Sequence, residues 1–206
     1  ARTYPGAGPH LIYLPERPFD LEKFPQQVKE VVEKYGRCVV AVSEGISDIT
    51  GTPIAAAFSK EVDSHGNVQL SGSGALGDAL ANLIKTKTDI TRVRADTFGY
   101  LQRSFPGVVS ANDAKEAFAV GREAVKLATS KDIDGSVAIR RKPGKKYQVY
   151  FERVELRSVA KETRHMPDAF IAPNGCDVTK AFIDYAKPIV GDLPRIGRFK
   201  RIAVKK

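Results

Sequence analysis

The chain has 206 residues, of which 42% are hydrophobic and 28% are charged, a composition typical of a globular protein with one or two domains. It contains no apolar run that approaches the roughly 18 residues of a membrane-spanning helix, and its first residues lack the charged-then-apolar pattern of a signal peptide. We therefore expect a cytoplasmic protein without a membrane partner.

The cysteines and histidines predict neither a disulfide framework nor a metal centre. Cys38 lies within an apolar run, where a thiol behaves as a small hydrophobic side chain, and Cys176 lies far away in the sequence. His10, His65 and His165 each lack a partner at the spacing of metal ligands. We expect none of them to bind a metal.

Basic residues exceed acidic ones, giving a net charge of +9, and they gather over residues 140–146 and in the tail from Arg195 to Lys206. Basic runs can bind nucleic acid. The first run, however, has the composition of a turn between two strands, and the tail offers only Phe199 for stacking bases. We therefore expect no nucleic-acid partner, and interpret the charge as solvated edges or as attraction for phosphorylated metabolites.

The first part of the chain predicts a parallel β-α-β unit. A strand over 10–14 precedes a helix whose apolar stripe ends at Gly36, and a second strand follows over 38–43. Glu44 comes directly after this strand, where ligands of open α/β sheets bind. Two interpretations stay open for Glu44: a ligand contact, or a loop carboxylate that caps a helix or pairs with a lysine.

A glycine-rich segment follows a short predicted strand over 67–70 and opens a helix with an apolar face from Leu76 to Ile84. Gly72, Gly74 and Gly77 match the spacing of a dinucleotide-binding loop. That loop needs a buried first strand, whereas this strand is short and polar. The pattern favours a glycine-rich helix start over a dinucleotide-dependent oxidoreductase.

The segment over 91–98 alternates arginines and an aspartate with smaller residues, which predicts a strand, and it runs into Gly99. Arg94, Tyr100 and Arg103 lie within ten residues of one another, beside a glycine that permits close approach of the backbone. Such residues can surround a dianion with charge-assisted hydrogen bonds. The alternative is that the arginines line a solvated edge.

The later part of the chain predicts helices and a hairpin. Residues 110–113 have the form of a capping box before a long helix, whose small-residue face from Ala114 to Ala128 permits close packing on a sheet. Paired strands are predicted over 135–139 and 147–154. A last helix is predicted to begin at Thr179, to turn Phe182 and Tyr185 inward, and to end at Pro188.

Several of these segments resemble the phosphofructokinase family. The run Arg94–Arg103 resembles the segment that contributes to fructose 6-phosphate binding, and Pro9–Phe19 with Val42–Gly45 resembles the segment before it. Residues 110–113 with their helix, and Phe182–Pro194, resemble later parts of the long bacterial branch that uses pyrophosphate.

The resemblance implies an α/β fold, the three-layer Rossmann-like open sheet of phosphofructokinases, with only its C-terminal portion present. It implies that residues 1–103 form part of the sugar-phosphate-binding acceptor domain. Residues 104–206 would be a segment that returns to the donor domain, followed by a C-terminal extension.

The resemblance also implies roles for single residues. Glu44 stands where the family has a carboxylate that accepts hydrogen bonds from sugar hydroxyls, and Arg103 where an arginine contacts the 6-phosphate. Arg94 matches a second phosphate arginine, often supplied across a subunit boundary, and Tyr100 stands where the ATP-using branch has a histidine. The substrate-binding residues implied are Glu44, Arg94, Tyr100, Leu101, Gln102 and Arg103.

Other family motifs have no counterpart in the sequence. These are the GlyGlyAsp donor loop, the segment that carries the catalytic base and the Mg²⁺ carboxylates, and the MetGlyArg sugar-binding turn. The family's glycine pair after Arg103 is replaced by Ser104 and Phe105. We expect a C-terminal half that binds fructose 6-phosphate, has no catalytic residue or metal ligand of its own, and does not transfer phosphoryl groups alone.

For the intact protein, the resemblance implies a phosphotransferase of glycolysis that uses Mg²⁺ and forms homodimers or homotetramers. Pyrophosphate is the expected phosphoryl donor because of the likeness to the long bacterial branch. Two alternatives stay open: an ATP-dependent 6-phosphofructokinase, and a non-catalytic basic module that binds phosphate compounds or nucleic acid.

Overall fold

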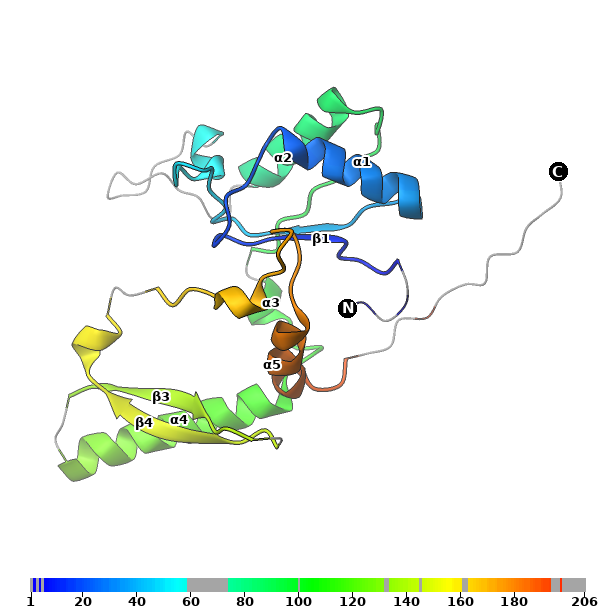
Figure 1. Ribbon diagram of the computed structural model, residues 1–206. Coiled ribbons are helices and arrows are strands. Elements are labelled where there is room, and N and C mark those ends of the chain that lie inside the picture. Colours follow the sequence, from blue (N-terminus) through cyan, green and yellow to red (C-terminus); the bar gives the residue numbers. More distant parts are fainter. Residues whose placement is uncertain are drawn as a thin grey trace. The chain divides into compact units, whose positions relative to one another are not determined.

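The computed structural model describes residues 2, 4, 6–58, 74–99, 101–131, 134–144, 146–160, 163–193 and 197. The chain divides into two compact units (Figure 1). Unit 1 comprises Ala1–Phe105 and Arg164–Ile183, and unit 2 comprises Pro106–Thr163 and Asp184–Lys206. The late segment Arg164–Ile183, called the strap below, therefore folds with the first half of the chain. The acceptor and donor roles predicted for 1–103 and 104–206 stay predictions.

Unit 1 contains the predicted parallel β-α-β arrangement. Strands β1 (Leu11–Tyr13) and β2 (Val40–Val42) pair in parallel, with Leu11 opposite Val40, and helix α1 (Lys23–Tyr35) connects them. Both strands are shorter than the sequence predicted. The carboxyl ends of the two strands lie at the same edge of the sheet, which places the loops after Tyr13 and Val42 beside each other.

Local signals fix both ends of α1. The carboxylate of Asp20 accepts hydrogen bonds from the backbone N–H groups of Glu22 and Lys23, at 3.0 and 3.1 Å. The bond from the Lys23 N–H is the largest cause of the lowered pKa of Asp20. At the other end, Gly36 takes a left-handed conformation with φ 70° and donates its N–H to the Val32 carbonyl. The helix therefore ends at the predicted residue.

Helices α1 and α2 (Ala75–Lys87) cover one face of this sheet (Figure 1). The apolar faces of both helices point into a common core, as their periodicity predicted. Phe24 and Ile46 are the most completely buried side chains, at 1% and 0% exposure. A short 3-10 helix, η1 (Ile54–Ala57), adds Ile54 and Ala55 to the core. The core consists of Leu11, Tyr13, Phe19, Phe24, Val28, Ile46, Ile54, Ala55, Leu76, Leu80, Ile84 and Cys176.

The strand predicted over 91–98 is wrong. These residues form no regular secondary structure, and all of them except Val93 are exposed. Alternating residue types predict a strand only where a neighbouring backbone completes the hydrogen-bond ladder, and the described part of the chain supplies no such partner. The strand predicted over 67–70 lies outside the described residues.

The strap closes unit 1 against the edge of β1. The Ile12 N–H donates to the Cys176 carbonyl at 2.8 Å, and Ile171 and Cys176 are buried. The strap also contains the 3-10 helix η3 (Asp168–Phe170) and a turn in which the Gly175 N–H donates to the Ala172 carbonyl at 2.9 Å. Gly175 has φ 73°, a conformation that glycine adopts without strain.

Unit 2 is a long helix on a hairpin. Strands β3 (Ser136–Arg141) and β4 (Val149–Val154) pair antiparallel, as predicted, and α4 (Ala111–Lys131) packs along the hairpin (Figure 1). A short 3-10 helix, η2 (Leu156–Ser158), follows β4. The Ser110 hydroxyl accepts the N–H of Asp113 at 3.0 Å, so the predicted N-terminal cap of α4 is confirmed.

The last helix, α5 (Lys180–Val190), differs from its prediction in two ways. It continues past Pro188 and ends at Gly191, which has φ 69° and donates to the Lys187 carbonyl. A proline this close to the end removes only one late helical bond, so two further residues stay helical. Tyr185 was predicted to point inward but is 43% exposed, with its ring 5.4 Å from the Arg141 guanidinium.

None of the helices that the structure describes is both long enough and apolar enough to cross a membrane.

Candidate functional site

Glu44 lies in the loop directly after β2, and both sides of this loop are anchored. The Ser43 N–H donates to the Tyr13 carbonyl of the neighbouring strand at 3.1 Å. Two residues after Glu44, Ile46 is fully buried, and its carbonyl accepts the N–H of Ile54 at 3.0 Å. Glu44 itself is half-buried. The loop thus holds a carboxylate at the carboxyl edge of the sheet, where ligands of α/β proteins bind.

Arg94 lies in the irregular segment that packs against the start of α2. A Cβ atom on Gly77 would come within 3.0 Å of the Ala95 Cβ, so glycine permits this close approach. Val93, on the other side of Arg94, packs against the core, whereas Arg94 is exposed. Gly77 therefore has a structural explanation. Gly74 occupies the left-handed N-cap position, and Gly72 lies outside the described residues.

The predicted phosphate-binding turn leads into the short helix α3 (Leu101–Ser104). Gly99 has φ 53°, and the Leu101 N–H donates to the Phe98 carbonyl at 2.9 Å, which closes the turn. Phe98 and Leu101 are 72% and 59% exposed. Apolar side chains of this size stand in solvent here, so the turn forms an open surface rather than part of the core.

The remaining predicted residues of this turn are placed only in part. Gln102 and Arg103 belong to α3 by their backbone, and their side chains lie outside the described part of the structure, as does Tyr100. Glu44 and Arg94 belong to the same compact unit as this turn. That their side chains converge on one anion-binding cleft stays a prediction.

Two titratable side chains of unit 1, those of Cys38 and Tyr13, have raised pKa values. Burial raises the pKa of the Cys38 thiol to about 11 and holds the pKa of the Tyr13 hydroxyl well above its usual range. The Tyr13 hydroxyl donates to Gln27 Oε1 at 2.8 Å. Both groups are therefore neutral at physiological pH, which fits a structural role in the core.

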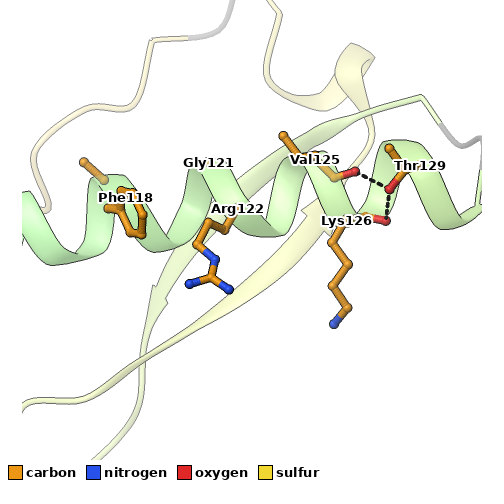
Figure 2. A pocket seen from close by; sticks show the side chains of 7 residues that line it. Phe118, Gly121, Arg122, Val125, Lys126 and Thr129 are labelled. Atoms are coloured by element: carbon orange, nitrogen blue, oxygen red, sulfur yellow. Dashed lines mark hydrogen bonds between the residues drawn. The ribbon is translucent and has the colours of Figure 1, made fainter.

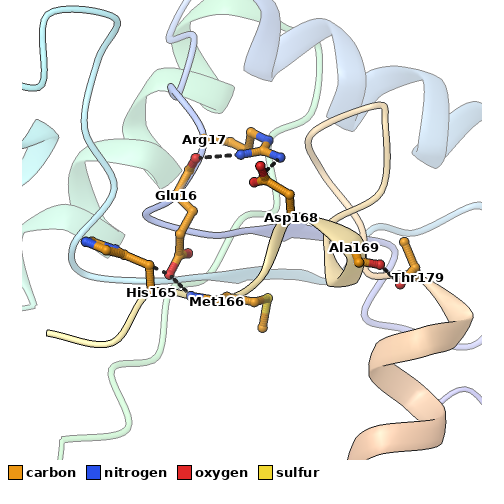
Figure 3. Close-up of polar contacts among 7 residues, drawn as sticks. All are labelled: Glu16, Arg17, His165, Met166, Asp168, Ala169 and Thr179. Atoms are coloured by element: carbon orange, nitrogen blue, oxygen red, sulfur yellow. Dashed lines mark hydrogen bonds and ion pairs between the residues drawn. The ribbon is translucent and has the colours of Figure 1, made fainter.

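Contacts between the strap and the loop after β1 were missed from the sequence (Figure 3). Glu16 accepts the N–H of Met166 at 2.8 Å, and Arg17 forms an ion pair with Asp168 at 2.8 Å. In each of these two contacts, the partners are about 150 positions apart in the sequence. A pattern of neighbouring residues carries no signal for such a pairing. Pro9–Phe19 was compared with a family segment, but its contact with the strap was not predicted from the sequence.

The small-residue face of α4, which permits close packing on a sheet, is exposed among the described residues. Within it, Phe118 is 69% exposed and Val125 is 64% exposed. The larger aliphatic side chains of Val120 and Leu127, on the other side of the helix, are partly covered instead.

This exposed face, called the α4 face below, forms a shallow hollow along a single helix (Figure 2). The Thr129 hydroxyl donates back to the Val125 carbonyl at 2.9 Å. The hollow is lined by Ala117, Phe118, Gly121, Arg122, Val125, Lys126 and Thr129.

Two arginines of the basic run over 140–146 are engaged within unit 2. Arg140 forms an ion pair with Glu152 at 2.7 Å across the hairpin. Arg141 donates to the Tyr185 carbonyl at 2.8 Å and lies over the ring of Tyr147 at 5.0 Å. Arg140 thus links the two strands of the hairpin, and Arg141 joins the hairpin to α5.

Metal-ligand chemistry is absent from the described part of the chain. No group of three or more His, Cys, Asp or Glu side chains in that part could hold a metal ion. The described residues therefore offer no preformed cluster of ligands for the Mg²⁺ that the family resemblance implies.

The parallel β-α-β unit and its covering helices are those of an open-sheet α/β protein, a class in which ligands bind beyond the carboxyl ends of the strands. Residues 5–128, more than half of the chain, match the family described as Phosphofructokinase. The chain therefore belongs to the phosphofructokinase family, and the resemblance is confirmed.

Relatives of this family match nearly the whole chain. A protein of Rhodospirillum rubrum named pyrophosphate–fructose 6-phosphate 1-phosphotransferase is 54% identical over 186 residues, which are 89% of this chain and 46% of that protein. A protein of the same name from Xanthomonas campestris is 32% identical, with 98% of this chain and 50% of that protein covered. The chain thus spans about half the length of the curated relatives it matches.

Solved structures confirm the fold. The crystal structure of a pyrophosphate-dependent phosphofructokinase from Marinobacter aquaeolei matches with a TM-score of 0.70 and 30% identity, covering 98% of this chain and 47% of that one. The predicted fold class, the phosphofructokinase fold, is therefore confirmed, with about half of that chain matched.

Proposed function

We propose that this chain is the fructose 6-phosphate-binding half of a pyrophosphate-dependent 6-phosphofructokinase. The intact enzyme would transfer a phosphoryl group from pyrophosphate to fructose 6-phosphate, giving fructose 1,6-bisphosphate and phosphate. The observation that carries this proposal is the match of nearly the whole chain to relatives with that name. Two features of the structure support the proposal as well. The anchored carboxylate of Glu44 can accept hydrogen bonds from a sugar, and the exposed segment that carries Arg94 can donate hydrogen bonds to a phosphate.

Under this proposal, the acceptor site uses Glu44 for the sugar, and two arginines and a tyrosine hydroxyl for its phosphate. The Glu44 carboxylate accepts hydrogen bonds from sugar hydroxyls. Arg103, Tyr100 and Arg94 donate to the 6-phosphate, each such charge-assisted bond contributing about 1.5–3 kcal/mol. Leu101 and Gln102 complete the turn that carries these groups.

The proposal assigns unit 2 to the donor side of the enzyme. Its support is the α4 face, which is apolar and exposed in this chain. The relatives contain about as much sequence again as the part matched here. We propose that the sequence corresponding to their unmatched half packs on the α4 face, which would bury Phe118 and Val125.

The metal and the assembly belong to the intact enzyme. Phosphoryl transfer from pyrophosphate needs positive charge near the donor, which Mg²⁺ supplies in this chemistry. Because the described residues here offer no preformed cluster of ligands, we propose that its ligands lie in the donor half. We further propose a cytoplasmic homodimer or homotetramer that does not bind nucleic acid.

The test is kinetic. In the full-length enzyme that contains this chain, Arg103→Ala should raise the fructose 6-phosphate KM by about tenfold or more, since it removes one charge-assisted phosphate contact. Arg92→Ala, an exposed arginine of the same segment without an assigned role, is the matched control. Unchanged kinetics for Arg103→Ala would remove it from the site. Parallel assays with pyrophosphate and ATP identify the donor.

A further inference from the structure

One carboxylate near the candidate site is nearly buried and is held by the strap (Figure 3). The side chain of Glu16 is 14% exposed, and its Oε1 accepts the backbone N–H of Met166 at 2.8 Å. The imidazole of His165 lies 4.0 Å from the same oxygen. A carboxylate with so little access to water is costly without a donor, so the Met166 N–H fixes where Glu16 can lie.

The loop that carries Glu16 is also coupled to the loop that carries Glu44. A Cβ on Gly45 would lie 3.5 Å from the Pro15 Cβ, which is van der Waals contact. Beyond Glu16, the Phe19 N–H donates to the Ser47 carbonyl at 2.7 Å. The two loops are therefore joined by the hydrogen bond between Phe19 and Ser47, and they approach each other closely at Pro15 and Gly45, next to Glu44.

The neighbouring ion pair contributes less to this connection. Arg17 and Asp168 are 2.8 Å apart, but the Asp168 side chain is 85% exposed, and exposed ion pairs contribute about 0–1 kcal/mol. The Glu16 bond is sheltered from water and ends on a backbone group of the strap. Of these two contacts, it is the stronger restraint on the loop after β1.

We propose that Glu16 is a positioning residue for the acceptor site. By binding the Met166 N–H it holds the loop after β1 against the strap, and that loop supports the loop that presents Glu44. The inference rests on the proposed function, because the sugar-binding role of Glu44 comes from there. It gives the strap a role in substrate binding, although the strap lies more than a hundred residues beyond Glu44 in the sequence.

Steady-state kinetics of the full-length enzyme test this role. Glu16→Ala should raise the KM for fructose 6-phosphate about tenfold, because a misplaced loop weakens the grip on the sugar, while the KM for pyrophosphate stays within about twofold. Glu16→Gln keeps an acceptor oxygen for the Met166 N–H and should restore the KM to within about threefold. Glu22→Ala removes an exposed carboxylate of the same unit and should change neither KM.

The other possible outcomes separate a failure of the positioning role from a failure of the proposed function. If Glu16→Ala leaves the fructose 6-phosphate KM unchanged while Arg103→Ala raises it, the positioning role is wrong and the proposed function stands. If Glu44→Ala and Arg103→Ala also have no effect, both proposals fail. An equal rise of both KM values would mean a general structural role and would overturn the inference. Should Glu16→Ala not fold, Met166→Pro removes the same N–H from the strap and must reproduce the selective rise.

Discussion

The two compact units differ in how completely they bury their apolar side chains. Unit 1 encloses a core in which Phe24 and Ile46 have almost no contact with solvent. In unit 2, none of the residues described between 106 and 163 or between 184 and 193 is buried. Because burial of apolar area is the main favourable term in folding, the stability of this chain resides in unit 1.

The difference has a structural cause. In unit 1 the sheet, two helices and the strap surround one core from several sides. In unit 2 a single helix covers a two-stranded hairpin, an arrangement that is marginal without a further layer. The α4 face marks the side on which that layer is missing from the described part of the chain.

The largest expected effect is in the core of unit 1. Phe24→Ala removes a fully buried ring and should lower the free energy of unfolding by about 3–5 kcal/mol. Phe98→Ala, which removes a ring that is 72% exposed, should change it by less than about 0.5 kcal/mol. Urea unfolding followed by circular dichroism measures both, and equal effects would refute the contrast between a closed core and an open turn.

A polar substitution on the α4 face should leave the stability of this chain nearly unchanged, and should lower the stability of the full-length enzyme proposed above. Phe118→Ser in the 206-residue chain should change the free energy of unfolding by less than about 0.5 kcal/mol, since the ring is 69% exposed. In the full-length enzyme, the same substitution should cost about 2–3 kcal/mol, because the ring would be buried there. Lys115→Ser, on an exposed lysine of the same helix, is the control. Identical small effects in both proteins would mean that nothing packs on this face.

A smaller effect is expected at the start of α4. Ser110→Ala removes the cap on the Asp113 N–H and the hydrogen bond to the Ile189 carbonyl, and should lower stability by about 1–2 kcal/mol. Ser130→Ala, in the last turn of the same helix, should have an effect below about 0.5 kcal/mol. Loss of helical signal on heating measures both. If Ser110→Ala were as stable as the parent chain, the cap would not hold the helix start.

Elements with local signals were predicted well. The stripe and the glycine stop of α1, the apolar face of α2 and the paired strands of the hairpin all follow from residues close together in the sequence. What failed is non-local: the strand over 91–98 has no partner among the described residues, and the α4 face is exposed among them. Periodicity shows which residues are apolar, but what covers them depends on the rest of the fold.

In the candidate site, too, residues marked by a local sequence feature were predicted, and residues that depend on distant parts of the chain were not. Glu44 was predicted because a strand end is a local feature, and the structure places it in an anchored loop at that end. The roles of Tyr100 and Arg103 came from family resemblance and still depend on it. Glu16 was missed because its partner, Met166, lies about 150 residues away, and no local pattern reports such a pair.

The smallest predicted effect concerns the thiol of Cys38 and tests how well unit 1 excludes water. Burial raises its pKa from the ordinary value of 9.0 to about 11 in the folded chain. An acid whose folded pKa is raised contributes stability that is fully present below about pH 9 and is lost as the pH rises through about 11. The parent chain should therefore lose more stability across this window than Cys38→Ala, which has no thiol at this position to titrate. Thermal melts of both chains at pH 8, 9, 10 and 11 measure the difference, and the subtraction removes tyrosine and lysine titrations common to both. Parallel pH profiles would show that water reaches this thiol in the folded chain.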